Sequence, residues 1–224
     1  MKQYKAFLFD LNGTMINDMP YHIRAWHRIL NNLGANISHE RMKQECYGKN
    51  EEVIERVLPG RFTLDEKKKM GFEKEKQYQA EFKPHLKLVP GLHDFMELSK
   101  NAGIKMAIGS AAIMFNIDFV IDNLRIRNYF EALISADNVG KSKPDPETFF
   151  KCASQLGITP ADCLVFEDTP KGAEAAANAK MNTVVLTLLH QQNEFNQYPN
   201  IIKFINDFTD PMLSNLIPVK GNGL

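Results

Sequence analysis

The sequence contains little cysteine, a single tryptophan and no excess of charge of either sign. Its 224 residues include only 3 cysteines, Cys46, Cys152 and Cys163. An odd number of cysteines, without the short spacings of metal ligands, argues against both a disulfide framework and a zinc site. Lys plus Arg number 27, as do Asp plus Glu, whereas partners of nucleic acids or anionic membranes usually carry a basic excess. We therefore expect neither a nucleic-acid nor a membrane partner.

Long apolar runs are also missing. The stretch between Met1 and Asp10 is too short for the apolar region of a signal peptide, and no later uninterrupted apolar run could span a bilayer. Hydrophobic residues nevertheless form 44% of the chain, which is enough for a sizeable core. The sequence therefore predicts a soluble, cytoplasmic, monomeric protein of one large domain, or of one domain that carries an insertion.

Short apolar segments alternate with helical patterns along most of the chain. Residues 4–10, 104–109, 163–166 and 183–188 have the continuous apolar character of buried strands. Two helical patterns between them have apolar faces, formed by Leu92, Phe95, Met96 and Leu98, and by Phe149, Phe150, Ala153 and Leu156. This alternation predicts an α/β fold with a Rossmann-like parallel sheet.

Residues 18–88 break the alternation and have only helical patterns. Asp18 and Pro20 suit the start of a first helix, a second follows Asn50, and residues 63–66 form a capping box that opens a third, highly charged helix. We expect an α-helical cap domain over residues 18–88, inserted into a core domain made of residues 1–17 and 89–224. The charged run of the third helix indicates a solvated face.

Carboxylates follow two of the predicted strands. Asp10 ends the first strand and precedes a tight turn, and Glu167 and Asp168 follow residues 163–166. Ligands of open α/β sheets bind at the carboxyl ends of the strands. If the two strands are neighbours, Asp10 and Asp168 can share Mg²⁺, which prefers oxygen ligands. Alternatively, Asp10 belongs only to a turn, and Asp168 only caps the helix that begins near Pro170.

Two further residues at predicted strand or helix ends suit an anionic ligand. Ser110 follows the strand 104–109, where backbone amides of a strand-to-helix turn can bind a phosphate oxygen. Lys143 precedes a proline-rich helix start; if it is buried it needs an anionic partner, and Asp10 together with a phosphate would provide one. The ordinary interpretations are a small residue in a turn and a solvated lysine.

Taken in order, these segments resemble the haloacid dehalogenase superfamily over nearly the whole chain. The matching motifs are Asp10-x-Asn12-Gly13-Thr14, Ser110, Lys143 and Glu167-Asp168. The helical insertion and the run from Tyr21 to Trp26 are similar to the subgroup that contains β-phosphoglucomutase and small sugar-phosphate phosphatases. The resemblance implies a magnesium-dependent phosphatase that acts on a small phosphorylated metabolite, above all a sugar phosphate.

The resemblance also implies a role for each motif residue. Asp10 is the implied nucleophile, which forms an aspartyl phosphate. The implied Mg²⁺ ligands are Asp10, the backbone carbonyl of Asn12, Asp168 and, as an outer-sphere or alternative ligand, Glu167. The implied ligands of the transferring phosphoryl group are Thr14, Ser110 and Lys143, of which Lys143 also screens the charge of Asp10.

Asn12 departs from the family pattern. Phosphatases and mutases of this family carry an aspartate there, which protonates the leaving oxygen and then accepts a proton from the attacking water or hydroxyl. An amide does neither, and loss of a general acid-base group typically costs about 10²- to 10⁴-fold in rate. Three explanations remain open: a slow or specialised enzyme, an engineered amide that traps a complex, or chemistry that needs no such acid. The non-enzyme hypothesis is a degenerate member that binds a phosphometabolite or a protein partner without turnover.

The cap is expected to determine the substrate. The resemblance suggests that His22 and one lysine, Lys74 or Lys76, lie near the site, with Lys49 in the cap loop. The mutase pattern has an arginine in that loop for a second phosphate, so Lys49 favours a monophosphate phosphatase over a β-phosphoglucomutase-type phosphomutase. Phosphonoacetaldehyde-type hydrolysis through a Schiff base on Lys49, and dehalogenation, rank lower. The ordinary interpretation is a surface histidine with solvated lysines.

Overall fold

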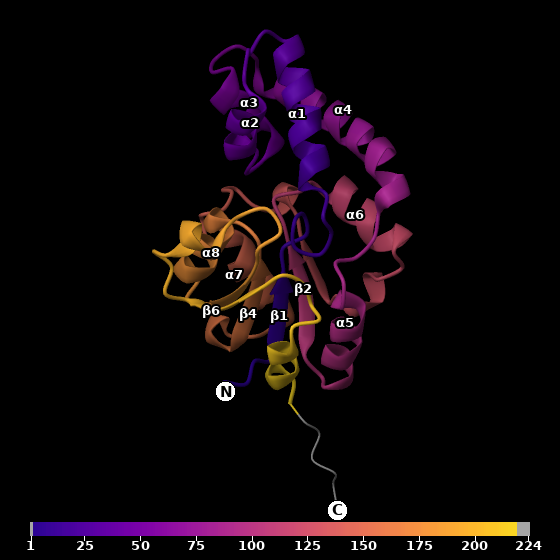
Figure 1. Cartoon of the computed structure of the whole chain (residues 1–224), viewed down its shortest axis with the longest axis vertical. Helices are drawn as coiled ribbons and strands as arrows, with labels where there is room; N and C mark the ends of the chain where they lie inside the picture. The colour runs from indigo at the N-terminus through magenta and orange to yellow at the C-terminus, as the bar shows by residue number, and fades with distance from the viewer. Residues whose placement is uncertain (1, 219–224) are drawn as a thin grey trace, which may run out of the picture.

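A single sheet of six parallel strands forms the centre of the molecule (Figure 1). The computed structural model describes residues 2–218, and the strand order is β3-β2-β1-β4-β5-β6. The strands are β1 (Ala6–Phe9), β2 (Lys105–Gly109), β3 (Ala132–Ile134), β4 (Cys163–Glu167), β5 (Asn182–Leu186) and β6 (Ile201–Ile205). The predicted α/β fold with a Rossmann-like parallel sheet is confirmed.

Helices cover both faces of this sheet. Phe7 and Phe9 of β1 pack into the cluster that contains α5 (Leu92–Asn101) and α6 (Met114–Asn123). Leu8, which points the other way, packs into the cluster with α7 (Glu147–Leu156) and α8 (Pro170–Asn178). Because successive strand residues alternate between faces and both faces are covered, β1 has to be apolar throughout. This explains the continuous apolar run in the sequence.

Some sequence predictions about strands and helix faces were incomplete or wrong. β3 has only three residues and β6 is an edge strand that is partly exposed, so neither gives a strong apolar signal. Leu98 and Phe150, predicted to be on buried helix faces, are 56% and 42% exposed. In α5 the buried face continues instead through Ser99, whose hydroxyl donates to the backbone carbonyl of Phe95 at 2.6 Å.

Four helices lie between β1 and α5, at the top of Figure 1. Three of them form a small apolar cluster of their own around Trp26 and Ile54. The predicted capping box is present: Thr63 accepts from the amide of Glu66, and the Glu66 carboxylate accepts from that of Thr63. The second of the four was not predicted. They are α1 (Met19–Asn32), α2 (His39–Glu45), α3 (Asn50–Val57) and α4 (Leu64–Phe82).

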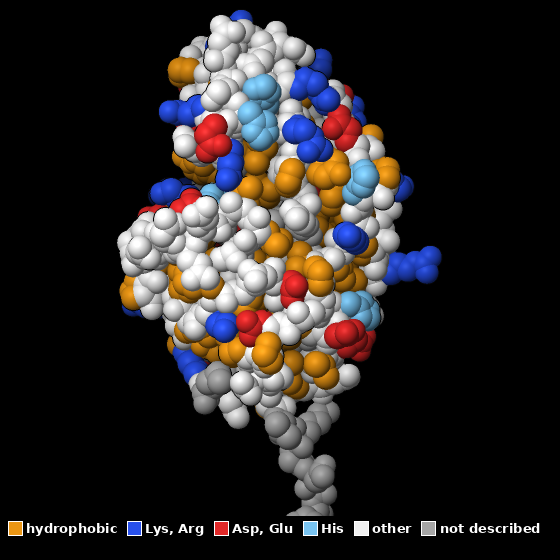
Figure 2. All heavy atoms as spheres, viewed as in Figure 1, with side chains coloured by type: hydrophobic (Ala, Val, Ile, Leu, Met, Phe, Trp, Pro, Cys, Tyr) orange, Lys and Arg blue, Asp and Glu red, His pale blue; other side chains and the backbone are white. Residues whose placement is uncertain are grey.

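The molecular surface reflects the balanced charge. Lys and Arg side chains are interspersed with Asp and Glu on the face shown in Figure 2. Among residues 2–218, no helix combines the length and apolar character that a membrane span requires. All three cysteines are free thiols, as the odd number predicted.

Candidate active site

Three carboxylates meet at the carboxyl ends of the two central strands. Asp10 directly follows β1, and its backbone amide donates to the carbonyl of Phe166 in β4 at 2.9 Å. Glu167 is the last residue of β4, and Asp168 follows it. One carboxylate oxygen from each of Asp10, Glu167 and Asp168 lies within 4.8 Å of the others. The pairing of β1 with β4 thus brings these sequence-predicted residues together.

Lys143 lies between two of these carboxylates. Its Nζ donates to Asp10 Oδ1 at 2.6 Å and to Glu167 Oε1 at 2.7 Å, and the residue is only 8% exposed. Burial by itself would lower the pKa of Lys143, but the two carboxylates more than compensate and raise it above its usual value. The lysine is therefore a buried, charged group beside Asp10. This agrees with the expectation that a buried Lys143 needs an anionic partner.

Both carboxylate oxygens of Glu167 accept hydrogen bonds from the protein. Oε1 accepts from Lys143, and Oε2 accepts from the backbone amides of Asp168 and Thr169, each at 2.8 Å. The absence of a side chain at Gly172 makes room for it, since a Cβ there would lie 1.8 Å from the carboxyl carbon of Glu167. These contacts suit a residue that orients Lys143 and the β4–α8 loop more than one that ligates a cation directly.

Asp168, in contrast, has an oxygen without a protein partner. Oδ1 accepts from the Thr14 hydroxyl at 3.2 Å, whereas the buried Oδ2 has no hydrogen-bond partner within residues 2–218. Burial raises the pKa of Asp168 well above its usual value and that of Asp10 to about 7. Three carboxylates balanced by one ammonium group leave excess negative charge in a buried site. A divalent cation would compensate that charge, and the oxygen donors suit Mg²⁺.

Gly13 lies against the unpaired oxygen of Asp168. It has a positive φ of 77°, and a Cβ at this position would lie 2.1 Å from Asp168 Oδ2. We expect Gly13→Ala to lower the free energy of unfolding by about 2–4 kcal/mol, because backbone strain adds to the displacement of Asp168. Thermal unfolding with and without Mg²⁺ measures this. Gly103→Ala, at φ 80° with nothing within 4 Å, is the control, with an expected loss of about 1–2 kcal/mol. Equal losses in both variants would contradict the prediction.

A cavity of about 110 Å³ lies between the sheet edge and the helices above it. Its lining includes most of the sequence-predicted site residues, namely Asp10, Asn12, His22, Lys74, Ser110, Lys143, Glu167 and Asp168. Thr14 and Lys49 are not among the lining residues that the structure describes. The Thr14 hydroxyl donates to Asp168, and Lys49 donates to the backbone carbonyl of Val139 at 2.6 Å.

Asn12 is held by groups that suit an amide. Its Nδ2 donates to Asp18 Oδ2 at 2.5 Å and lies 3.2 Å from Nε2 of His22. Asp18 is fully buried and also accepts from the Gly13 amide and the Tyr78 hydroxyl. The sequence suggested Asp18 only as the start of a helix. Although it does precede α1, its carboxylate accepts from Asn12, which lines the cavity.

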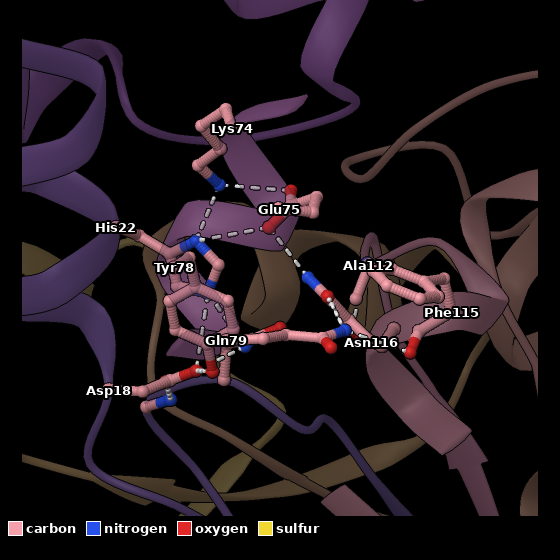
Figure 3. Close-up of polar contacts among 12 residues, drawn as sticks. Asp18, His22, Lys74, Glu75, Tyr78, Gln79, Ala112, Phe115 and Asn116 are labelled. Atoms are coloured by element: carbon pink, nitrogen blue, oxygen red, sulfur yellow. Dashed lines mark hydrogen bonds and ion pairs between the residues drawn. The ribbon is translucent and has the colours of Figure 1, made fainter. Parts of the chain in front are cut away.

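Buried polar residues of α1 and α4 line the cavity, and Figure 3 shows their contacts with one another. Lys74 is 1% exposed, and its Nζ lies 2.6 Å from His22 Nδ1 and 2.9 Å from Glu75 Oε1. The ordinary interpretation of a surface histidine and a solvated lysine is therefore wrong for His22 and Lys74, which are buried. Both line the cavity, near the site as the resemblance suggested. Lys76, in contrast, is exposed and pairs with Glu73, as predicted for a solvated lysine.

Sequence reasoning missed four residues around this cluster: Asp18, Glu75, Tyr78 and Asn116. The buried positions of α4 are Gly71, Lys74, Glu75, Tyr78 and Phe82. Their spacing is that of one helix face. The pattern is not recognisable from hydrophobic residues alone, because two of the buried positions are Lys74 and Glu75. Asn116, on α6, could not be connected to α4 without the tertiary structure.

A cavity at the carboxyl edge of a parallel sheet, with a lysine beside paired carboxylates, is the arrangement of an α/β enzyme. The model of one family, described as Haloacid dehalogenase-like hydrolase, matches residues 7–186. The chain therefore belongs to the haloacid dehalogenase-like hydrolases. This confirms the resemblance inferred from the motifs and the predicted enzyme class.

Relatives of this chain include named phosphatases and a mutase. Hexitol phosphatase B of Escherichia coli (strain K12) is 27% identical over 212 residues, which cover 86% of this chain and 88% of that protein. Beta-phosphoglucomutase of Bacillus subtilis (strain 168) is 31% identical over 189 residues, with 80% and 82% coverage. Among solved structures, a HAD hydrolase, family IA, variant 3, from Entamoeba histolytica superposes with a TM-score of 0.84 at 27% identity, covering 95% of this chain and 99% of that one.

Proposed function

We propose that this chain is a magnesium-dependent phosphatase that hydrolyses a small phosphorylated metabolite, a sugar phosphate, through an aspartyl phosphate on Asp10. The observation that carries this proposal is the position of Asp10, which shares one cavity with the Lys143 ammonium and the unpartnered oxygen of Asp168. The relatives named as a hexitol phosphatase and a β-phosphoglucomutase support a phosphorylated carbohydrate as substrate.

The donor set fits Mg²⁺. Asp168 offers an unpaired buried oxygen and Asp10 a second carboxylate, and the proposed third ligand is the backbone carbonyl of Asn12. Bound there, Mg²⁺ would neutralise charge on the phosphate oxygens. Thr14 holds Asp168 in place, and Glu167 holds Lys143, so both act on the site through a neighbour.

Each residue of the site then has a proposed role in the reaction. The Asp10 carboxylate attacks phosphorus, the bond to the leaving oxygen breaks, and water hydrolyses the resulting acyl phosphate. Lys143 and Ser110, which line the cavity, bind phosphate oxygens, so catalysis is mainly positioning and charge stabilisation. Position 12 has an amide that donates to Asp18. We propose that proton transfer at the leaving oxygen therefore limits turnover.

Lys49 gives no support to the alternative reactions. Its Nζ donates to the carbonyl of Val139 in the core, so it links α3 to the sheet domain and does not point into the cavity. A phosphomutase would need a cation there for a second phosphate, and a Schiff-base enzyme would need an amine there. A phosphatase needs neither.

The proposal is tested by phosphate release from a panel of sugar and polyol monophosphates. We expect release that requires Mg²⁺, stops with EDTA and resumes when Mg²⁺ is added in excess. Because Asn12 makes slow turnover the expected case, the assay includes a burst measurement at high enzyme concentration. If neither the protein nor Asn12→Asp showed a burst or turnover on any substrate, the proposal would be wrong.

The ligand role of Asp168 predicts a graded effect on metal binding. We expect Asp168→Ala to weaken Mg²⁺ binding by about 100-fold or more, and Thr14→Val, which removes only the hydrogen bond to Asp168, by about 10-fold. Isothermal titration with Mg²⁺ gives both affinities, and Asp162→Asn at the exposed opposite end of β4 is the control. Unchanged Mg²⁺ affinity in Asp168→Ala would remove Asp168 from the ligand set.

A further inference from the structure

An ion pair of α4 lines the same cavity as Asp10, which follows β1. Lys74 and Glu75 are consecutive residues of α4, both at most 3% exposed, and both line the cavity. Nζ of Lys74 lies 2.9 Å from Glu75 Oε1 and 5.0 Å from the centre of the Trp26 ring. Figure 3 shows the two side chains converging with His22. The α4 side of the cavity therefore has a cation that is already neutralised.

This charge balance argues against a second phosphate on the α4 side of the cavity. A phosphate group needs cations or amides that are free to bind it. Two further lysines line the cavity within the described chain. Lys143 pairs with Asp10 beside the sheet, and Lys171 is half-exposed and pairs with Glu174 at 3.2 Å. A second phosphate near Glu75 would be repelled by the negative charge of its buried carboxylate.

Glu75 is equipped to accept hydrogen bonds from a ligand. Burial opposes ionisation, but Lys74 and His22 hold the pKa of Glu75 at about 2, so it is a carboxylate at neutral pH. Its two oxygens accept from Lys74 and, at 2.7 Å, from Asn116. A carboxylate has about four acceptor sites, so further donors can be bound. Gln79 donates to Asn116 Oδ1 at 2.8 Å, which fixes the Asn116 amide so that its nitrogen faces Glu75.

We propose that Glu75 is a specificity-determining residue that accepts hydrogen bonds from hydroxyl groups at the end of the substrate remote from the phosphate. The Lys74–Glu75 pair at the same time excludes a second phosphate from that end. Trp26 adds an apolar wall against which the C–H face of a sugar or polyol packs. This inference rests on the proposed phosphatase function and narrows its substrates to polyhydroxylated monophosphates.

Glu75→Gln tests the inference with three substrates. For a hexitol or hexose monophosphate we expect KM to rise about 10-fold with little change in kcat, because a hydrogen bond to a charged acceptor is lost. The kinetics of p-nitrophenyl phosphate, which has no hydroxyl groups at that end, should stay the same. The preference for hexose monophosphate over hexose bisphosphate should fall by about 10-fold, because Lys74 loses its partner. Glu73→Gln, an exposed position of the same helix, is the control and should match the wild type throughout.

Two further measurements keep the test decisive. Titration calorimetry with Mg²⁺ and each sugar phosphate, with every variant combined with Asp10→Asn, measures binding without turnover, so a failed phosphatase proposal is distinguished from a failed role for Glu75. Asn116→Ala leaves the ion pair intact. It should raise the dissociation constant of the monophosphate severalfold without admitting the bisphosphate, and it serves if Glu75→Gln does not fold. Binding of all ligands with wild-type affinity in the variants would overturn the inference.

Discussion

Asp10→Asn should lower phosphate release by about 10⁴-fold or more, which is the scale on which loss of a nucleophile acts. The amide has the shape of the carboxylate but does not attack phosphorus. It also removes the charge that Lys143 contacts at 2.6 Å. The fold should survive, because three clustered carboxylates share a single ammonium group and the loss of one relieves repulsion. We expect a melting temperature that is unchanged or higher in the absence of Mg²⁺.

The experiment that assigns this role is a rapid acid quench with a monophosphate labelled on its phosphoryl group. The wild type should retain label on the protein, and Asp10→Asn should retain none even at saturating Mg²⁺. Asp162→Asn makes the same chemical change at a surface position paired with Lys5 and should behave as the wild type. Protein-bound label in Asp10→Asn would place the nucleophile elsewhere.

The residues at the sheet edge were predictable from the sequence because each follows a strong local signal. Asp10 and Asp168 end runs of apolar residues that must be buried on both faces of a sheet. Lys143 was predictable only conditionally, since nothing in its neighbourhood says that the chain places it between Asp10 and Glu167. That placement depends on long-range contacts that no local pattern reports.

The site residues of α4 were harder to predict because their local signals favour a different environment. Lys74 and Glu75 belong to a helix rich in charged residues, where such pairs are usually solvated. Only Tyr78 and Phe82, one and two turns later, indicate a buried face. The helix packs its polar side against Asn116 of α6, which is a contact across 41 residues of sequence. Local propensity cannot encode such a pairing.

We expect Asn12→Asp to have opposite effects on activity and on stability. We expect Asn12→Asp to raise turnover by about 10²- to 10⁴-fold, the usual contribution of a general acid-base group. The introduced carboxyl would lie where the amide now donates to Asp18 Oδ2 at 2.5 Å. That buried like charge would raise its pKa above the ordinary aspartate value, which favours the protonated form that a general acid needs.

The same shift has a defined sign for stability. A carboxyl whose pKa is raised by folding stabilises the fold only while it is protonated, so stability should fall as pH rises from the unfolded pKa through the folded one. Melting temperatures and kcat of Asn12→Asp are measured across pH 4–9 (about the working range of these groups). We expect turnover to be higher on the acid side, where the introduced carboxyl is protonated, and stability to decline as the pH rises to neutral. Asn17→Asp, an exposed position, should change neither.

A double variant separates the two effects. Asn12→Asp combined with Asp18→Asn restores one carboxyl and one amide to the pair, so the hydrogen bond that joins residues 12 and 18 can form with donor and acceptor exchanged. Stability at neutral pH should return toward the wild-type value, while turnover should stay above it because the carboxyl remains in the cavity. If the single and double variants both matched the wild type in turnover, protonation of the leaving oxygen would not limit this enzyme. Position 12 would then contribute only its backbone carbonyl to the site.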